Sequence, residues 1–221
     1  MNGESLKLYS YWRSSAAFRV RIALNLKGLE YQIVPVNLLQ DGGEQHGAAY
    51  SEINPQELVP VLMHGQRVFR QSLAIIDYLD ETWPDTPLMP TIARDRQRVR
   101  AIAQAVACDI HPLNNLRVQQ YLTNEFGADE AAREKWMRHW IATGFAAIEL
   151  LLNDNPSTGE FCEGDVPTMA DCCLVPQVFN ARRAGLDLAP YPVISRIERA
   201  CMALPAFDAA QPSKQPDAPP A

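Results

Sequence analysis

Hydroxyl side chains stand where the sequence passes from a short strand into a helix. Ser14 and Ser15 follow the alternating apolar segment 6–9 and precede residues 16–27, whose apolar side chains recur at helical spacing. At the N-terminus of a helix, unpaired backbone N–H groups and the positive end of the helix dipole stabilise an anion. The two serines are therefore candidates for binding a negatively charged group, and a simple N-cap serine is the alternative interpretation.

Two more segments stand out beside the serines. Gln71 and Ser72 lie at a second strand-to-helix turn, where another helix N-terminus could bind a carboxylate. Pro60 is the second residue of the segment 59–63, which otherwise has the composition of a central strand. A cis bond between Val59 and Pro60 would explain this placement, because X–Pro bonds adopt the cis form at little cost.

The elements that would position these residues follow from two alternating periodicities in the first 85 residues. The predicted order is strand 6–9, helix 16–27, strand 31–36, a loop, strands 59–63 and 67–69 with a hairpin turn at 64–66, and helix 72–83. Pro35 indicates that the strand 31–36 ends there or lies at a sheet edge. These elements make up the predicted N-terminal domain, residues 1–85.

The character of the sequence changes at a predicted linker, residues 84–92, which begins with three prolines in seven residues. Beyond it we expect only helices, in a domain spanning 93–210. The predicted helices are 94–124 with an interruption at 109–112, 129–152, 168–184 and 192–204. Thr168 and Asp171 have the spacing of a capping box, which is most simply structural. The proline-rich tail 211–221 is expected to be extended or disordered.

Charge and cysteine content exclude several classes of function. The 221 residues carry 20 Lys and Arg against 26 Asp and Glu, a net charge of −6, and the parts up to and after residue 85 contribute −3 each. Neither part has the basic patch of a protein that binds nucleic acid or a membrane surface. The five cysteines form no CxxC pair and no phosphate loop is present, so neither a metal nor a nucleotide site is expected. No apolar run is long enough to span a membrane and no signal peptide is seen, which predicts a cytoplasmic protein.

Several motifs together resemble the zeta class of the cytosolic glutathione transferases. The motifs are SSAAFRVRIAL at 14–24, DGGEQ at 41–45, QSLAII at 71–76, DCCLVPQ at 171–177 and DLAPYP at 187–192. The resemblance implies an N-terminal thioredoxin-like domain, with a mixed four-stranded sheet and helices, that binds glutathione. It further implies an all-helical C-terminal domain that binds a small dicarboxylate substrate, and a homodimer.

The same resemblance implies roles for individual residues. Ser14 would donate its hydroxyl to the glutathione sulfur, with Ser15 and the helix N-terminus adding positive potential. Val59 would pair its backbone with the cysteinyl part of glutathione, which requires a cis bond to Pro60. Gln45 would hold the glycyl end of the ligand.

Further roles are implied at the γ-glutamyl end and in the helical domain. Gln71 and Ser72 would hold the γ-glutamyl end of glutathione. His111 and Asn115 would lie near the same site, and Arg183 matches an arginine that binds a substrate carboxylate. Other candidates for binding a substrate carboxylate are Arg13, His111 and Arg117.

The energetics of thiol activation agree with these roles. A free thiol has a pKa near 8.5, and lowering this pKa by about two units requires roughly 2.7 kcal/mol in favour of the thiolate. One hydrogen bond to a charged group supplies roughly 1.5–3 kcal/mol and a helix N-terminus roughly 0.3–2 kcal/mol. Ser14 and the helix start would therefore suffice without a metal.

Two positions depart from the zeta pattern. Ala16 stands where cysteine is usual, which excludes addition by a thiol of the protein itself and leaves the glutathione route intact. His111, in the segment DIHP, resembles the bacterial maleylpyruvate isomerases and could bind a carboxylate, relay a proton or only cap a kinked helix. Leu116 is apolar where an added arginine would favour the smaller, pyruvate-bearing diacid.

Three hypotheses for function follow from the resemblance. The leading one is a glutathione-dependent cis–trans isomerase that converts maleylacetoacetate to fumarylacetoacetate in tyrosine and phenylalanine breakdown. The second is the same reaction on maleylpyruvate, or transferase and dehalogenase chemistry on small α-haloacids. The third is a non-catalytic glutathione-binding protein. Ser14, Gln71 and Arg183 argue against it, whereas Ala16 leaves it open.

Overall fold

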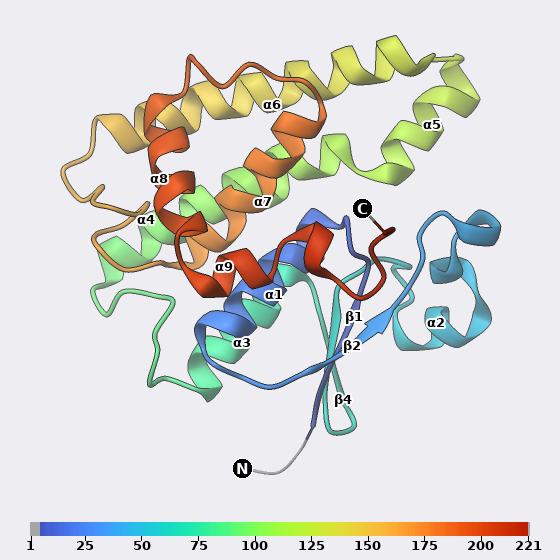
Figure 1. Ribbon diagram of the computed structural model, residues 1–221, viewed down its shortest axis with the longest axis horizontal. Coiled ribbons are helices and arrows are strands. Elements are labelled where there is room, and N and C mark those ends of the chain that lie inside the picture. Colours follow the sequence, from blue (N-terminus) through green and yellow to red (C-terminus); the bar gives the residue numbers. More distant parts are fainter. Residues whose placement is uncertain (1–4, 221) are drawn as a thin grey trace. The chain divides into compact units, whose positions relative to one another are not determined.

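The structure is a computed structural model that describes residues 5–220, and it divides into two compact units (Figure 1). The units are residues 5–88 with 204–220, and residues 89–203. The division after residue 88 falls inside the linker predicted at 84–92. The C-terminal boundary differs from the predicted helical domain 93–210, because the residues from 204 onward group with the first unit.

The first unit is built on a four-stranded mixed sheet with the strand order β2-β1-β3-β4. The strands are β1 (Leu6–Ser10), β2 (Gln32–Pro35), β3 (Val61–His64) and β4 (Arg67–Arg70). β1 pairs with β2 in parallel and with β3 antiparallel, and β3 and β4 form the predicted hairpin. Pro35 ends β2, which is an edge strand as its composition predicted. The predicted thioredoxin-like arrangement is confirmed.

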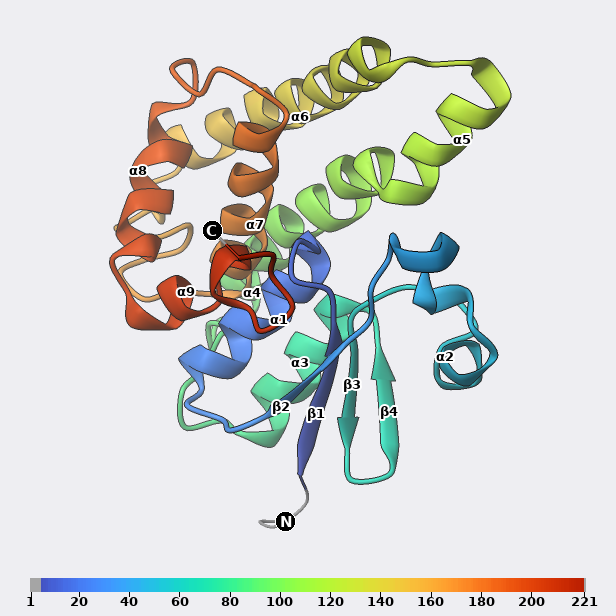
Figure 2. The ribbon, with the colours of Figure 1, turned by 45° about the vertical axis from the view of Figure 1, so that its right-hand side comes forward.

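Helices cover this sheet on both sides. α1 (Ser15–Leu26) and α3 (Ser72–Thr82) lie beside each other on one side of the strands, and the short helix α2 (Ala48–Ile53) lies on the other (Figure 2). The sequence predicted only a loop where α2 is found. This loop segment also contains the 3₁₀ turns η1 (Gln40–Gly42) and η2 (Glu44–His46). A six-residue helix spans fewer than two turns, so it shows no helical period.

The C-terminal segment is ordered against the first unit, which corrects the prediction of an extended or disordered tail. It forms α9 (Pro205–Ala209), which packs on α1, and a 3₁₀ turn η5 (Pro212–Lys214). The Gln215 side chain is buried and donates hydrogen bonds to the backbone oxygens of Ala209, at 3.2 Å, and Gln211, at 2.8 Å. The segment is therefore a series of turns, held by local hydrogen bonds and by packing on α1.

The second unit is helical. Its elements are α4 (Ala93–Gln104), the π-helix η3 (Ala105–Ile110), the 3₁₀ turn η4 (His111–Asn114), α5 (Leu116–Phe126), α6 (Glu130–Asn153), α7 (Met169–Arg183) and α8 (Pro192–Met202). The predicted interruption of the first long helix is present, but the regular helix ends five residues before the predicted break because a π-helix precedes Pro112. No helix within residues 5–220 is long and apolar enough to cross a membrane.

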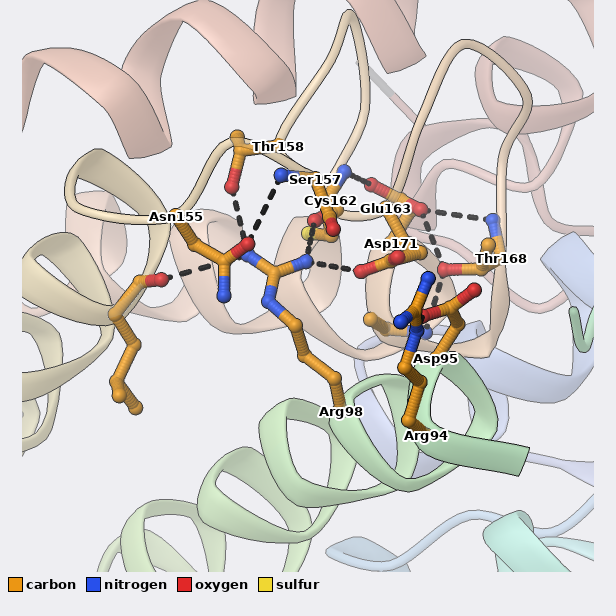
Figure 3. A network of polar contacts seen from close by, with 12 residues as sticks. Arg94, Asp95, Arg98, Asn155, Ser157, Thr158, Cys162, Glu163, Thr168 and Asp171 are labelled. Carbon is orange, nitrogen blue, oxygen red and sulfur yellow. Dashed lines mark hydrogen bonds and ion pairs between the residues drawn. The ribbon is translucent and has the colours of Figure 1, made fainter. Parts of the chain in front are cut away.

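A buried polar network fixes the start of α7 (Figure 3). The Asp171 carboxylate accepts hydrogen bonds from the backbone N–H groups of Cys162 and Thr168, both at 2.8 Å, and from the Thr168 hydroxyl at 2.9 Å. This geometry confirms the predicted capping box. Burial raises the pKa of the Asp171 carboxyl, whereas these hydrogen bonds lower it. From α4, Arg98 donates to the Cys162 carbonyl at 2.6 Å and pairs with Glu163, so the same loop is held from a second helix.

Candidate active site

The strand register brings three predicted site segments to one end of the first unit's sheet. Tyr9, near the end of β1, pairs with Val61 at the start of β3, and Val61 pairs with Arg70 at the end of β4. The chain therefore leaves β1 and β4, and enters β3, at the same end of the sheet. The segments at that end are 11–15, 59–60 and 71–72. The predicted cis bond between Val59 and Pro60, just before β3, is present.

Ser14 is the N-cap of α1 and retains a proton to donate. Its Oγ accepts a hydrogen bond from the Ala17 backbone N–H at 3.2 Å, and its own N–H donates to the Tyr11 carbonyl at 2.9 Å. Because the hydroxyl accepts inside the helix, its single O–H proton is left for an acceptor outside the helix. The first turn of α1 contains no acidic side chain that would offset the positive helix end. The capping role and the anion-binding role of Ser14 are therefore compatible.

The residues next to Ser14 differ in solvent exposure. Ser15 is buried, whereas Arg13 and Ala16 are half-buried. The Arg13 guanidinium lies over the Trp12 ring, 5.6 Å from its centroid, a cation–π contact. This contact keeps a positive charge close to the start of α1.

Gln71 and Ser72 form the second helix N-terminus of the site. Gln71 precedes α3 with φ 69°, and its side-chain amide donates to Gln56 Oε1 at 2.9 Å instead of capping the helix. A positive φ in a residue other than glycine costs about 1–3 kcal/mol and is typical of functional sites. Ser72 is buried, and its Oγ accepts a hydrogen bond at 3.1 Å from Arg19 on α1. The Ser72 proton is therefore also available to an external acceptor.

Gln45 is joined to the same region by a chain of side-chain contacts. Its Nε2 lies 3.0 Å from His46 Nε2, and His46 Nδ1 lies 2.6 Å from Glu57 Oε2. Glu57 stands two residues before Val59, where the cis bond begins. Gly43 has φ 109°, and a Cβ there would lie 2.4 Å from the Gln45 amide nitrogen, so glycine is required. Gln45 is 5% exposed, and its Oε1 has no hydrogen-bond partner among residues 5–220. A buried amide oxygen without a partner indicates a position where a ligand or water completes the site.

The predicted ligand residues of the helical unit lie on η4, at the start of α5 and at the end of α7. Asn115 caps α5, where its Oδ1 accepts from the Arg117 backbone N–H at 3.1 Å. His111 is half-buried at the start of η4. Arg183 is the exposed last residue of α7, and its guanidinium donates to Asn180 Oδ1 at 2.8 Å. Asn115 thus has the structural role of a cap, and Arg183 presents a positive charge held by a neighbour on its own helix.

The donor set of the first unit fits glutathione. Several polar groups lie at one end of the sheet. They are two helix N-termini without acidic first-turn residues, two serine hydroxyls with a proton to donate and a buried amide. Such donors suit a ligand that carries carboxylates at its ends and a thiolate between them. Within residues 5–220, no group of three or more His, Cys, Asp or Glu side chains could hold a metal ion.

Sequence reasoning did not identify two buried arginines behind the site. Arg19 and Arg21 are 2% and 0% exposed, although they lie two residues apart on α1. Arg19 contacts Ser72, and Arg21 contacts the loop that precedes Ser14. Arginine is almost never fully buried without partners, so its occurrence twice in a helix of apolar residues was a signal that could have been read.

Comparisons with known proteins agree with this geometry. Residues 8–87 match the family model described as glutathione S-transferase, N-terminal domain. The probable maleylacetoacetate isomerase of Vibrio cholerae serotype O1 is 50% identical over 214 residues, which cover 97% of this chain and 99% of that protein. A solved structure of maleyl pyruvate isomerase, a bacterial glutathione S-transferase in the zeta class, has a TM-score of 0.94 and 50% identity, covering 96% of this chain and 100% of that one.

A second solved structure is relevant to the chemistry. It is the maleylacetoacetate isomerase from Anaeromyxobacter dehalogenans 2CP-1 with bound dicarboxyethyl glutathione and citrate in the active site. Its TM-score is 0.87 at 45% identity, and the match covers 100% of both chains. The likeness to these relatives extends over both units and not only over the thioredoxin-like part. The chain belongs to the zeta class of the glutathione S-transferases, the family of the maleylacetoacetate and maleylpyruvate isomerases.

Proposed function

We propose that this protein is a glutathione-dependent cis–trans isomerase of maleyl diacids, with maleylacetoacetate as substrate and fumarylacetoacetate as product. The observation that carries the proposal is Ser14, whose Oγ accepts from Ala17 and whose proton is left for a bound thiolate. The relatives named as isomerases of two maleyl diacids support the reaction class. The dicarboxyethyl glutathione bound to one relative supports the joining of the thiol to a four-carbon diacid.

The residues of the first unit bind and activate the thiol. Bound glutathione supplies a thiolate that adds reversibly to the cis double bond, which lets the carbon–carbon bond rotate before the thiolate leaves. Ser14 donates a hydrogen bond from its hydroxyl to the sulfur, and the start of α1 adds the positive end of the helix dipole. Gln71 and Ser72 bind the γ-glutamyl carboxylate at the start of α3, and Gln45 binds the glycyl end. The Val59 backbone pairs with the cysteinyl part next to the cis bond.

Arginines orient the substrate carboxylates. Arg183 is the leading candidate because its guanidinium is exposed and oriented by Asn180, and a fork of N–H donors matches a carboxylate. Arg13 and Arg117 are further candidates for the second carboxylate. Positive charge at these positions also stabilises the negative charge that develops on the diacid during addition. His111 is a candidate for relaying the proton that the carbon skeleton gains and loses.

The substrate assay tests the proposal and separates it from its alternatives. Purified protein with glutathione is given maleylacetoacetate and, separately, maleylpyruvate, and the trans products are measured. We expect turnover of both, with the higher kcat/KM on maleylacetoacetate. A higher kcat/KM on maleylpyruvate would favour the second hypothesis, to which the 50% identity of the maleylpyruvate isomerase structure lends support. Glutathione binding without turnover of either diacid would refute the isomerase.

Arg183 and its neighbour Arg182 provide a matched pair for the carboxylate role. We expect Arg183→Ala to lower kcat/KM for the diacid roughly tenfold or more, because a charge-assisted hydrogen bond contributes about 1.5–3 kcal/mol. Glutathione affinity should not change. Arg182→Ala removes the same charge one residue away, where it pairs with Glu198, and should leave kcat/KM unaltered. Equal losses in both variants would contradict a specific role for Arg183.

Location and assembly complete the proposal. The protein is proposed to act in the cytoplasm as a homodimer, as the family resemblance implies. Support for a reducing compartment comes from the cysteines, all five of which are free thiols and four of which are buried. Sedimentation of the purified chain would measure its oligomeric state directly.

A further inference from the structure

Both backbone polar groups of Trp12, in the loop before Ser14, are held by side chains from other elements of the first unit. The Trp12 backbone N–H donates to Asp217 Oδ2 at 2.8 Å, across 205 positions of sequence. The Trp12 carbonyl accepts from Arg21 Nη2 at 3.1 Å. The loop is therefore fixed two residues before Ser14, by contacts that neither strand pairing nor helix formation supplies.

Arg21 distributes its N–H donors over this loop and the C-terminal segment. Its Nη1 donates to the Ser10 hydroxyl at 3.0 Å and lies 3.5 Å from the Tyr11 carbonyl, and its Nε donates to the Ala210 carbonyl at 3.0 Å. The Tyr11 carbonyl is the same group that accepts from the Ser14 N–H. Arg21 and the Ser14 N–H thus contact the same carbonyl, in the turn that places the Ser14 hydroxyl.

The charge of Arg21 requires a counter-charge because the side chain is fully buried. Burial lowers the pKa of Arg21 to about 10, and the nearby Tyr31 and Asp217 oppose this shift. Asp217 is the carboxylate of that pair, and it stands in the C-terminal segment that sequence composition predicted to be disordered. The contact of Asp217 therefore joins the end of the proline-rich segment to the loop that precedes Ser14.

We propose that Asp217 and Arg21 form a clamp on the 11–14 loop and that Asp217 is a positioning residue for the thiolate-binding hydroxyl of Ser14. The inference rests on the proposed function of Ser14. The clamp acts through the backbone of Trp12 and does not touch the ligand. Small displacements of a catalytic group reduce its contribution steeply, so the loop must be held to a fraction of an ångström.

The test compares Asp217→Ala and Asp217→Asn with a control in the same segment. Asp208→Ala is the matched control, because Asp208 is an exposed carboxylate of the C-terminal segment that pairs with Lys214 and does not contact the loop. Amide hydrogen exchange of the Trp12 N–H reports the clamp itself. The ultraviolet absorbance of bound glutathione, followed against pH, reports the thiol pKa and hence the placement of Ser14.

We expect Asp217→Ala to speed exchange of the Trp12 amide by tenfold or more, to raise the pKa of the bound thiol and to lower kcat/KM roughly tenfold. The Kd of glutathione should change less than about twofold, because Gln71 and Ser72 are untouched. Asp217→Asn should restore most of the slow exchange of the Trp12 amide, since its amide oxygen still accepts from Trp12. Asp208→Ala should leave the exchange rate, the thiol pKa and kcat/KM unchanged.

Two results would overturn the clamp. One is unchanged exchange of the Trp12 amide in Asp217→Ala. The other is a fall in thermal stability with no change in the pKa of the bound thiol, which is what a purely structural tail would give. If wild-type protein does not lower the thiol pKa at all, the proposed role of Ser14 fails and so does the positioning role of Asp217. The exchange rate would then report only whether the clamp holds the loop.

Discussion

Ser14 has two functions that substitution can separate. Its Oγ accepts from the Ala17 N–H, which stabilises the fold, and its proton is proposed to stabilise the bound thiolate, which affects only the complex. Ser14→Ala removes both. Ser14→Gly removes the hydroxyl at little cost to the helix, because glycine is a tolerable N-cap and the backbone at Ser14, φ −67° and ψ 117°, is accessible to it.

The expected magnitudes follow from these contacts. Loss of an N-cap hydroxyl reduces the free energy of unfolding by about 1 kcal/mol in Ser14→Ala and by a few tenths in Ser14→Gly. Loss of a hydrogen bond to the thiolate costs roughly 1.5–3 kcal/mol, which equals an increase of about 1–2 units in the pKa of the bound thiol. Both variants should show the same pKa increase despite their different stabilities.

Absorbance titration of bound glutathione and urea denaturation measure the two quantities independently. Ser15→Ala is the matched control, because it removes a neighbouring buried hydroxyl and leaves the N-cap in place. Ser14→Thr should retain both the cap and the lowered pKa. The reasoning is refuted if Ser14→Gly binds glutathione with an unchanged thiol pKa, or if Ser15→Ala raises that pKa as much as Ser14→Ala.

Two further predictions concern the capping box of α7 and the glycine beside Gln45. Asp171→Ala leaves two buried backbone N–H groups without an acceptor and should reduce the free energy of unfolding by roughly 2–6 kcal/mol, at about 1–3 kcal/mol per donor. Urea denaturation measures this loss, and a reduction no larger than that of Asp165→Ala, a control in the neighbouring loop, would contradict it. Gly43→Ala should weaken glutathione binding without altering the thiol pKa, because its Cβ displaces the Gln45 amide. Gly42→Ala also has a positive φ but open space around it, so calorimetry should find binding unchanged there.

Local rules predicted most of the elements correctly. The cis bond before Pro60 and the capping box of α7 each depend on a few adjacent residues, and sequence is sufficient for such features. Failures occurred where stability comes from distant contacts. α2 is too short to show a period, and the C-terminal segment owes its order to bonds between residues near 210–217 and residues near 12–21. Composition alone gives no indication of a partner 200 residues away.

The positions of the candidate site residues were predictable in part for the same reason. Ser14, Gln71 and Ser72 stand at helix N-termini as predicted, because a helix start can be read from a few residues, and their roles as ligands of glutathione stay a prediction. Their support could not be assigned. Arg19 and Arg21 look like the polar positions of an amphipathic helix, yet α1 is buried around its circumference, which only the packing of α3 and α9 reveals.

The placement of these arginines supports the proposal that a chain of net charge −6 binds an anionic ligand. Surface charges are screened within about 8 Å at physiological salt, whereas buried charges are screened much less. Arg19 donates to the Ser72 hydroxyl of the proposed ligand site, and Arg21 donates to the loop that precedes Ser14. A guanidinium in direct contact with the sulfur would lower the thiol pKa further, but the nucleophilicity of a thiolate falls with its pKa, and the best attacking thiol has a pKa near ambient pH. A hydroxyl at the sulfur lowers the thiol pKa by about 1–2 units, while the guanidinium groups contact other residues and not the sulfur. The thiolate is then both abundant and reactive.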